Sequence, residues 1–355
     1  MGKGRSIRLS QPRISRAGLS LAVRRFLPRR WRWILAAYGL TVWILDLVEQ
    51  IRAFRPSFMV DALSYAAAGR HLLAGEPLYA LFQLSGPYEL TAAAVGRGFV
   101  YPPTAALLFA PLAPFGAEGL SLVFAAAWFL FGLLAFRLAR QSGLGVRSAA
   151  LLTLVVTFSG PAINAASSGN VNLLVADALL ASWLWPDSAG MLAVVGGAMK
   201  LFPAAGLIWT VRRRGSLIWP FALGVGLIVA ATLAVGPAGW LDFLSAFGHG
   251  RSASWYYVAS PTQLLGPGIG TAVGYGLAAA ACVGAWRLRD DAVAFALLGW
   301  AMILPAPDWY SHYLLLPLAA IMPLVARSLA IRFGRSATES DSPPAGQRDR
   351  GTVAI

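Results

Sequence analysis

The stretch LSLVFAAAWFLFGLLAF, residues 120–136, decides the fold class because it contains no charged side chain over its whole length. A helix needs about 20 mainly apolar residues to cross the hydrocarbon core of a bilayer, and this stretch approaches that length. Similar apolar stretches recur from Trp33 to Val325, separated by short polar breaks. The 355-residue chain is 57% hydrophobic and 12% charged, which is more apolar than a soluble domain requires. The sequence therefore predicts an all-α, polytopic membrane protein.

Basic residues lie in the gaps between the apolar stretches, and their distribution predicts which ends of the helices face the cytoplasm. The net charge is +14, and ten of the 29 Lys and Arg residues fall within residues 1–32, which contain no acidic residue. Cytoplasmic loops of membrane proteins carry an excess of Lys and Arg, and anionic lipid attracts such segments. A nucleic-acid-binding surface would instead cluster its charge on one folded face. We therefore expect residues 1–32 to form a basic cytoplasmic leader, with membrane lipids and no nucleic acid as partners.

The alternation of apolar stretches and basic clusters predicts about ten transmembrane helices, both termini in the cytoplasm and one transmembrane domain over residues 33–329. The first span covers residues 33–51. Residues 52–102 are too polar to cross and form a first outer loop, in which residues 61–74 are expected to form an interfacial helix that ends at Gly75. A second large outer loop is expected over residues 236–262. Residues 330–355 are rich in Ser, Pro, Gly and charge, which predicts a disordered cytoplasmic tail.

Residues 189–211 leave two alternatives. One continuous helix would place Arg212, Arg213 and Arg214 on the outer side, which the distribution of basic residues disfavours. Two half-length helices that meet near Lys200 and Pro203 would return the chain to the cytoplasmic side, since about eleven residues rise only about 16 Å. Broken helices of this kind are tolerated where they line a cavity. The alternative to this broken pair is the single helix, kinked and with a different topology.

Two charged side chains on the predicted outer face are the first candidates for chemistry. Asp61 opens the expected helix of the first outer loop, so it is either an N-cap or a general base that accepts a proton from a hydroxyl group. Lys200 lies in an apolar run, where a charge needs a partner. It either binds an anion or extends its amino group to the membrane interface from a helix end.

Further polar and aromatic residues extend this candidate site. His312 begins a segment that is otherwise apolar, so it binds a phosphate oxygen, orients a carboxylate, or anchors the interface beside neighbouring aromatic residues. The aromatic residues of the second large outer loop are equally open to two interpretations, because aromatic rings stack on sugars and also populate membrane interfaces. The residues expected to line a substrate site are Tyr65, His71, Tyr101, Asn170, Asn172, His249, Trp255, Tyr256 and Asp308.

Several reaction classes lack their characteristic motifs. The sequence has no phosphate-binding Gly-Lys-Ser/Thr loop, no GxGxxG, no HExxH and no GxSxG motif. The lone Cys282 provides neither a disulfide framework nor a cysteine metal site. Isolated acidic residues argue against a carboxylate-rich site for a divalent cation. We expect no metal site and no cofactor.

Four parts of the sequence carry a family resemblance. They are DALSYAAAGRHLLAGEPLYA (61–80), FVYPPTAALLFAPLA (99–113), SSGNVNLLVADALL with GGAMKLFPAAGLIW (167–180 and 196–209), and DWYSHYLLLPLA (308–319). In their order and spacing they resemble the GT-C class of membrane glycosyltransferases. They are most similar to glycosyltransferase family 87, the bacterial polyprenyl-phosphate-mannose-dependent mannosyltransferase-like proteins. The resemblance covers about residues 55–325 and implies a GT-C-like fold.

The resemblance also implies roles for individual residues. In the GT-C class an aspartate of the first outer loop is the catalytic base, and Asp61 is the matching position. The lysine of the family's KLFP-like element matches Lys200, and the family's late histidine matches His312. These two residues, with Arg251, would hold the donor phosphate. The family often has a glutamine after the glycine where this chain has Asn170, which leaves the role of that side chain open.

The implied reaction is the transfer of a hexose, mannose by resemblance, from a polyprenyl-phosphate sugar to a lipid or glycan acceptor. It would take place at the outer face of the bacterial inner membrane, with inversion. Such a donor already carries a good leaving group, so one base and a phosphate site suffice, whereas hydrolysis of an ordinary glycosidic bond uses a carboxylate pair. The alternative is a membrane transporter or lipid flippase without transferase activity. It predicts inverted repeats, but the large first outer loop has no counterpart in the second half.

Overall fold

The computed structural model describes residues 58–89, 98–251 and 260–340, together with Thr41, Ile44 and Val48. The chain divides into a unit of residues 1–46 and a larger unit of residues 47–355. Of the smaller unit only Thr41 and Ile44 are described, both in helical conformation. The predicted leader 1–32 lies outside the described residues, as does most of the predicted first span. The regular structure in the described part of the larger unit is helical except for one parallel pair of two-residue strands.

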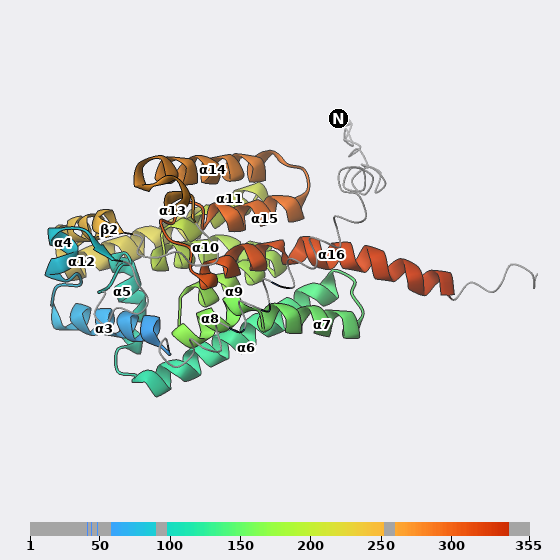
Figure 1. The fold of residues 1–355 in the computed structure, drawn as a ribbon, viewed down its shortest axis with the longest axis horizontal. Helices are drawn as coiled ribbons and strands as arrows, with labels where there is room; N and C mark the ends of the chain where they lie inside the picture. The colour runs from blue at the N-terminus through green and yellow to red at the C-terminus, as the bar shows by residue number, and fades with distance from the viewer. Residues whose placement is uncertain are drawn as a thin grey trace, which may run out of the picture. The chain divides into compact units, whose positions relative to one another are not determined.

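The helices and strands of the larger unit follow one another as Figure 1 shows. Their order is α3 (Val60–Ala74), α4 (Leu81–Ser85), β1 (Tyr88–Glu89), α5 (Pro103–Phe109), 3₁₀ helix η1 (Ala110–Leu112), α6 (Ala117–Gln141), α7 (Val146–Thr157), α8 (Gly160–Ser168), α9 (Asn172–Leu184), η2 (Pro186–Ser188), α10 (Ala189–Met199), η3 (Phe202–Gly206), α11 (Leu207–Arg212), α12 (Ile218–His249), β2 (Gly250–Arg251), α13 (Pro261–Leu265), α14 (Pro267–Arg287), α15 (Asp291–Ala301), η4 (Ser311–Leu314) and α16 (Leu315–Ser340).

Among the described residues, four helices are long and apolar enough to cross a membrane: α6, α12, α14 and α16. A fifth candidate is the pair α7 and α8, which is bent by 55° at the break between its two parts. These helices establish an all-helical protein with several candidate membrane spans. The count of about ten spans stays a prediction.

Helix α6 illustrates why these apolar sequences fold as they do. Leu120, Phe124 and Phe131 are completely buried and lie on one face, because residues three, four or seven apart share a side of a helix. Leu122 and Phe129 on the other face are 73% and 75% exposed. A helix that is apolar all round, with one face packed and the other open, is suited to hydrocarbon rather than water. The packed faces of α6, α9, α15 and α16 form the main core.

Helices α10 and α11 form a broken hairpin, as one of the two alternatives for residues 189–211 predicted. Helix α10 ends at Met199, η3 follows after Lys200 and Leu201, and α11 continues to Arg212. The two halves run back along each other, and glycines make the close approach possible. A Cβ at Gly190 would lie 3.2 Å from Thr210, one at Gly196 3.2 Å from Pro203, and one at Gly206 3.1 Å from Ala193. Lys200 therefore lies at the tip of the hairpin, and Arg212 lies at its base.

Other predicted boundaries differ in how far the helices extend. The interfacial helix ends as predicted, because Gly75 adopts a left-handed conformation (φ 69°) and caps α3. Helix α12 continues to His249 through a kink at Gly236, so the first part of the predicted outer loop 236–262 is helical. The reason is Pro237, whose fixed φ suits the first turn of a helix that resumes at once. Helix α16 continues to Ser340, so residues 330–340 of the predicted tail are helical, and residues 341–355 lie outside the described part.

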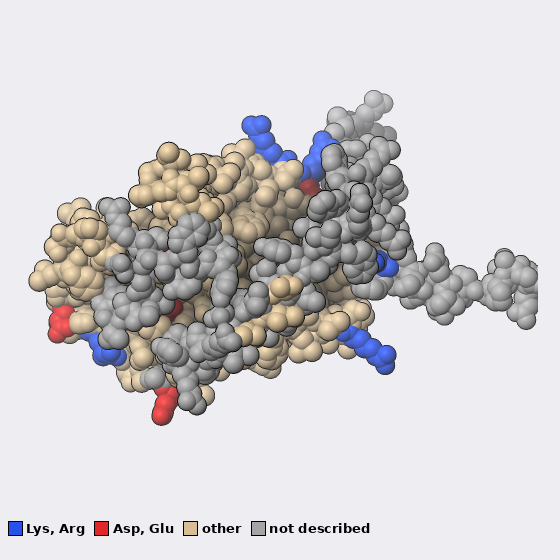
Figure 2. All heavy atoms as spheres, viewed as in Figure 1, with Lys and Arg blue, Asp and Glu red and all other residues tan. Residues whose placement is uncertain are grey.

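Ionic contacts gather where α11 ends and α15 begins. Arg212 Nη2 lies 2.7 Å from Asp291 Oδ1, and Arg327 Nη2 of α16 lies 2.7 Å from Asp290 Oδ2. Asp290 also caps α15 by accepting hydrogen bonds from two backbone N–H groups. On the face drawn in Figure 2, charged side chains are few, and most of them lie near the margins of the described surface. The Arg and Asp side chains thus mark one end of the hairpin and of α15, opposite the hairpin tip.

Candidate active site

A cavity of about 110 Å³ lies at the tip of the hairpin. Its wall is formed by helix α3, the segment before α5, the turn between α8 and α9, helix α12 and the segment after α15. The lining residues are Asp61, Tyr88, Val100, Tyr101, Pro102, Asn170, Lys200, Leu201, Phe202, Phe243, Phe247, Ala306, Pro307, Asp308, Tyr310, His312 and Tyr313. Residues separated by up to 252 positions in the sequence, from Asp61 to Tyr313, therefore meet around one space.

Asp61 is directed into the fold rather than toward the end of its helix. Helix α3 has Met59 as its N-cap residue, which makes no side-chain cap hydrogen bond, so the N-cap interpretation of Asp61 is wrong. Only 3% of Asp61 is exposed, and its Oδ2 accepts a hydrogen bond of 2.8 Å from Asn170 Nδ2. A buried carboxylate requires such hydrogen bonds, because leaving water is costly for a charge. Asn170 therefore fixes the orientation of the Asp61 carboxyl group.

Gly169 allows helix α3 to approach the turn that carries Asn170. It caps α8 in the left-handed conformation (φ 66°), which residues with a side chain rarely adopt. A Cβ at this position would lie 2.5 Å from Cβ of Ala62, the residue next to Asp61. The backbone N–H of Met59 also donates to the carbonyl of Ser167 at 2.7 Å. The SSGNVN turn is therefore joined directly to the first turn of α3.

Asn170 and Asn172 connect Asp61 with Lys200. Asn170 Oδ1 accepts a hydrogen bond of 2.9 Å from the backbone N–H of Asn172. Asn172 is completely buried, and its Oδ1 accepts a hydrogen bond of 3.1 Å from Lys200 Nζ. Lys200 Nζ also lies 3.5 Å from the ring centroid of Tyr313, a favourable contact between a cation and an aromatic face. The amino group at the hairpin tip is thus held beside the cavity by an amide oxygen and a ring.

His312 is positioned by two asparagines. Its Nδ1 lies 2.7 Å from Asn164 Oδ1, and because an amide oxygen only accepts, Nδ1 donates this hydrogen bond. The backbone carbonyl of His312 accepts a hydrogen bond of 3.2 Å from Asn172 Nδ2. The imidazole also stacks on Tyr310, with ring centroids 5.5 Å apart. Asn172 therefore contacts both the lysine and the histidine side of the cavity.

Two tyrosines form a polar contact next to Asp61. Tyr65 OH donates to Tyr101 OH at 2.9 Å, and the ring of Tyr65 stacks on Phe109 at 4.6 Å. Burial, with a smaller contribution from Tyr101, raises the pKa of the Tyr65 phenol, so this hydroxyl group stays protonated. Tyr65 is buried behind the cavity wall, whereas Tyr101 is part of that wall. Phe243 and Phe247 of α12 provide an apolar part of the wall.

Asp308 is a second carboxylate in the cavity wall. It lies in the segment between α15 and η4 and is 4% exposed. Its Oδ1 accepts a hydrogen bond of 2.9 Å from Gln263 Nε2 of α13. Within the described ranges, no three His, Cys, Asp or Glu side chains converge at distances that could hold a metal ion.

The remaining predicted site residues lie elsewhere or cannot be placed. His71 is exposed on α3, where its Nδ1 lies 2.6 Å from Glu76 Oε2. His249 ends α12, and its Nδ1 lies 3.2 Å from the carbonyl oxygen of Gln83. Neither histidine lines the cavity. Arg251 belongs to β2, but its side chain is outside the described part of the chain, and so are Trp255 and Tyr256.

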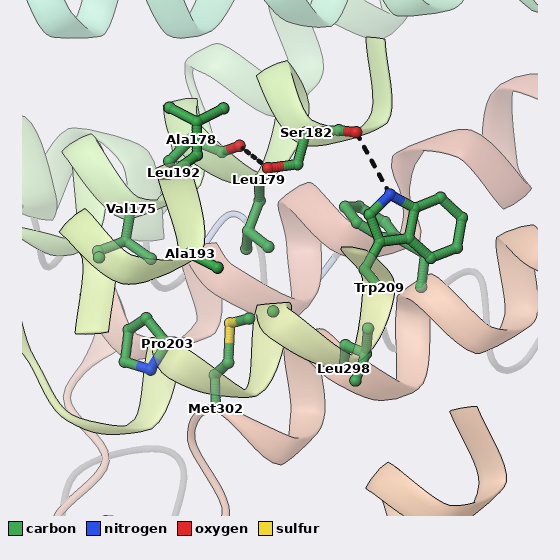
Figure 3. Close-up of a pocket in the computed structure, with 13 residues that line it drawn as sticks. Val175, Ala178, Leu179, Ser182, Leu192, Ala193, Pro203, Trp209, Leu298 and Met302 are labelled. Atoms are coloured by element: carbon green, nitrogen blue, oxygen red, sulfur yellow. Dashed lines mark hydrogen bonds between the residues drawn. The ribbon is translucent and has the colours of Figure 1, made fainter. Parts of the chain in front are cut away.

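A second cavity under the hairpin has a different character. Its volume is about 10 Å³, and its wall is almost entirely apolar, including Leu179, Pro203 and Met302. Figure 3 shows that its polar groups are already paired, since Ser182 donates to the Ala178 carbonyl and the Trp209 indole donates to the Ser182 carbonyl. Such a volume barely accommodates a water molecule. This space is a packing gap, and the cavity at the hairpin tip is the candidate active site.

Sequence reasoning missed Asn164, Gly169 and Gln263. Asn164 interrupts an apolar stretch, which was the available signal, but its partner His312 is 148 positions away. Gly169 was visible as a glycine before two asparagines, yet its need for φ > 0 and close approach to α3 becomes evident only in the fold. Gln263 gave a local signal only as the last residue of the capping-box pattern SPTQ (260–263), and its contact with Asp308 depends on how α13 packs.

The match to known families covers more than half of the chain. The family model described as glycosyltransferase family 87 matches residues 99–317. The chain belongs to glycosyltransferase family 87. Membership of this family, together with the apolar helices, identifies a membrane glycosyltransferase. The family 87 match includes Asn170, Lys200 and His312 but begins after Asp61. No curated protein and no solved structure matches this family 87 chain.

Proposed function

We propose that this family 87 glycosyltransferase transfers a hexose, mannose being the preferred candidate, from a polyprenyl-phosphate donor to a lipid or glycan acceptor. The transfer inverts the anomeric configuration and takes place at the outer face of the bacterial inner membrane, without a metal or cofactor. The observation that carries the proposal is the cavity in which Asp61, Lys200 and His312 face one space. A carboxylate at one side and cationic or polar groups at the other match a reaction that removes a proton and stabilises an anionic leaving group.

In the proposed reaction Asp61 is the general base. As the acceptor oxygen attacks the anomeric carbon of the donor, Asp61 accepts the hydroxyl proton. The bond between the anomeric carbon and the phosphate oxygen breaks, and its electron pair leaves with the polyprenyl phosphate. This single displacement inverts the anomeric centre. One carboxylate is enough, because the phosphate leaving group needs no protonation.

Lys200 and His312 would bind the donor phosphate. The ammonium group of Lys200 provides a positive charge beside the leaving oxygen, and a His312 imidazolium, which keeps its Nδ1–H bond to Asn164, donates a second hydrogen bond from Nε2. Negative charge on the phosphate grows as the bond to the sugar breaks, so both contacts strengthen in the transition state. The proposal includes Arg251 as a further phosphate ligand, since β2 follows α12 near the cavity wall.

The distribution of charge supports the proposed orientation in the membrane. Arg212, Arg213 and Arg327 lie at the end of the bundle away from the hairpin tip. The positive-inside rule favours this end in the cytoplasm, which leaves the cavity at the outer face. No nucleotide sugar is available there, and a lipid-linked donor is the chemical alternative. About ten spans, with both termini in the cytoplasm, are part of the same proposal.

The test is a transfer assay with the purified, reconstituted full-length protein. Polyprenyl-phosphate mannose or glucose is incubated with a crude lipid extract, and products are detected by mass. The wild type should form a product one hexose heavier than its acceptor. The Asp61→Asn variant should retain its fold and donor binding but lose transfer by a factor of about 10³ or more, as expected for loss of a general base.

Asp187→Asn is the matched control, because Asp187 is exposed in η2 and does not line the cavity. Its rate should equal that of the wild type. Full activity in Asp61→Asn would refute the role of Asp61. Movement of lipid-linked sugar across a liposome membrane without any transfer product would favour the flippase alternative instead.

A further inference from the structure

Asp308 is held in the cavity wall by a helix cap. Ser260 and Gln263 form a reciprocal capping box at the start of α13, in which Ser260 Oγ accepts from the Gln263 N–H at 3.1 Å and Gln263 Oε1 accepts from the Ser260 N–H at 2.8 Å. The remaining donor of the Gln263 amide, Nε2, contacts Asp308 Oδ1 at 2.9 Å. Ser260 Oγ also donates to the carbonyl of Pro307. The cap that begins α13 therefore also fixes the backbone and the side chain of the Pro307–Asp308 segment.

The surroundings of this cap keep it in place. Gly270 of α14 packs directly on α13, because a side chain at this position would collide with the carbonyl oxygen of Pro261. The indole of Trp309 donates to the carbonyl of Ile303 at 2.8 Å, which ties the residue after Asp308 to the segment that directly follows α15. A side chain supported by packing and by hydrogen bonds on both sides is preorganised for a ligand.

We infer that Asp308 is a specificity-determining residue that binds hydroxyl groups of the donor hexose. The inference rests on the proposed function and adds the part of the substrate that this carboxylate recognises. Asp308 lies four positions before His312, and both side chains line the cavity. Since the sugar is covalently attached to the phosphate, a group placed next to the phosphate site meets the hexose.

Charge decides which part of the donor Asp308 contacts. A carboxylate repels a phosphate but accepts hydrogen bonds from neutral donors. Sugar hydroxyl groups are such donors, and the two oxygens of a carboxylate accept from neighbouring hydroxyl groups together. Gln263 donates to Oδ1 of this carboxylate, which orients the group within the cavity wall. The carboxylate would thus select for a hydroxyl pair of a defined orientation.

The experiment compares donors that differ by single hydroxyl groups. A short-chain polyprenyl-phosphate mannose and its analogues lacking one hydroxyl group each are assayed with wild type, Asp308→Asn, Asp308→Ala and Gln263→Ala. In the wild type, at least one analogue should have a kcat/KM lower than that of the parent donor by on the order of 100-fold, because the site's buried acceptor is left without its partner. In Asp308→Ala the same analogue and the parent should differ by less than about threefold.

The intermediate variants provide the matched comparison. Asp308→Asn retains the shape and should keep a part of the discrimination. Gln263→Ala leaves the carboxylate but removes its support, so it should raise KM for the parent donor more than it lowers kcat. Asp187→Asn is again the control and should discriminate as the wild type does, because Asp187 is exposed in η2.

Three results separate the possible failures. If Asp308→Ala discriminates among the analogues as the wild type does, Asp308 does not bind a donor hydroxyl group and the inference is refuted. If Asp308→Ala transfers nothing, the same comparison is made on donor binding in the Asp61→Asn background, where turnover is not needed, and unchanged relative affinities refute it equally. If the wild type transfers no hexose from any donor, the proposed function itself fails, and the inference falls with it.

Discussion

Asn170 should contribute to catalysis by orienting Asp61, and two substitutions separate this role from a structural one. The amide makes two hydrogen bonds: Nδ2 donates to Asp61 Oδ2 at 2.8 Å, and Oδ1 accepts from the Asn172 N–H at 2.9 Å. Asn170→Ala removes both. Asn170→Asp retains an acceptor for the Asn172 N–H but replaces the donor with a second carboxylate beside Asp61.

The magnitude follows from the burial of both groups. Asn170 and Asp61 are 2% and 3% exposed, so the bond between them is made out of contact with water. A hydrogen bond to a charged group in such a position contributes about 1.5–3 kcal/mol. If this energy holds Asp61 in its reactive orientation, Asn170→Ala should lower kcat by roughly 10-fold to 150-fold. Asn170→Asp should lower kcat at least as much, because two adjacent carboxylates share a proton instead of acting as one free base.

The assay is the initial rate of hexose transfer at a saturating donor concentration, together with the unfolding temperature of each variant. Asn170→Ala should also unfold at a lower temperature, because the start of α9 loses a hydrogen bond worth about 1 kcal/mol. Asn170→Asp keeps the hydrogen bond at the start of α9, so its unfolding temperature should approach that of the wild type at a pH low enough to protonate one of the two carboxyl groups. An Asn170→Asp enzyme with kcat within about threefold of the wild type, beside an impaired Asn170→Ala enzyme, would show that Asn170 only supports α9. Our interpretation of the pair would then be wrong.

Three further substitutions test other parts of the structure. Lys200→Met keeps the apolar stem at the hairpin tip but removes the charge, so KM for the donor should rise by tenfold or more. Lys200→Arg should retain more of the affinity. Equal KM values in the wild type and both variants would exclude a phosphate contact. Gly169→Ala should destabilise the protein by about 1–3 kcal/mol more than Gly143→Ala in thermal or denaturant unfolding. Both glycines have positive φ, but a Cβ at Gly169 lies 2.5 Å from Ala62 and one at Gly143 lies 3.7 Å from Ala330, so similar losses would contradict the close approach of α3. Arg212→Ala should lower the free energy of unfolding by about 1–3 kcal/mol without changing KM, because Arg212 donates to Asp291 and to the carbonyl of Ala285 at the end of the hairpin away from the cavity. Arg332 is exposed, so Arg332→Ala should change neither quantity.

Much of the helical framework could be predicted from the sequence, because apolar length and backbone-breaking residues are local signals. Gly75 ends α3 as predicted, and Lys200 with Pro203 marks the break between the two halves of the hairpin. The extent of α12 could not be predicted, because Gly236 and Pro237 look like the end of a helix. In the structure only Gly236 is non-helical, and the helix resumes directly after it. Packing rather than local propensity decides that the helix continues here.

The candidate site could be predicted only in part. Asp61, Lys200 and His312 stood out as isolated polar residues in an apolar chain, and the fold brings them to one cavity. The same criterion also selected His71 and His249, which lie outside the cavity wall, since a polar residue near a helix end gives no information about the direction of its side chain. The supporting contacts of Asn164 and Gln263 span 148 and 45 positions, and no local pattern encodes them.

The out-and-back path of α10 and α11 has a consequence for mapping the protein in intact cells. Because the two halves lie against each other, the chain enters and leaves this region at the same end. Residues 189–212 therefore do not change the side of the membrane on which the chain lies. A membrane-impermeant reagent that labels a cysteine introduced near Pro186 must therefore also label one introduced near Gly215. A topology derived by counting hydrophobic segments will place every later segment on the wrong side of the membrane if it counts α10 and α11 as one crossing.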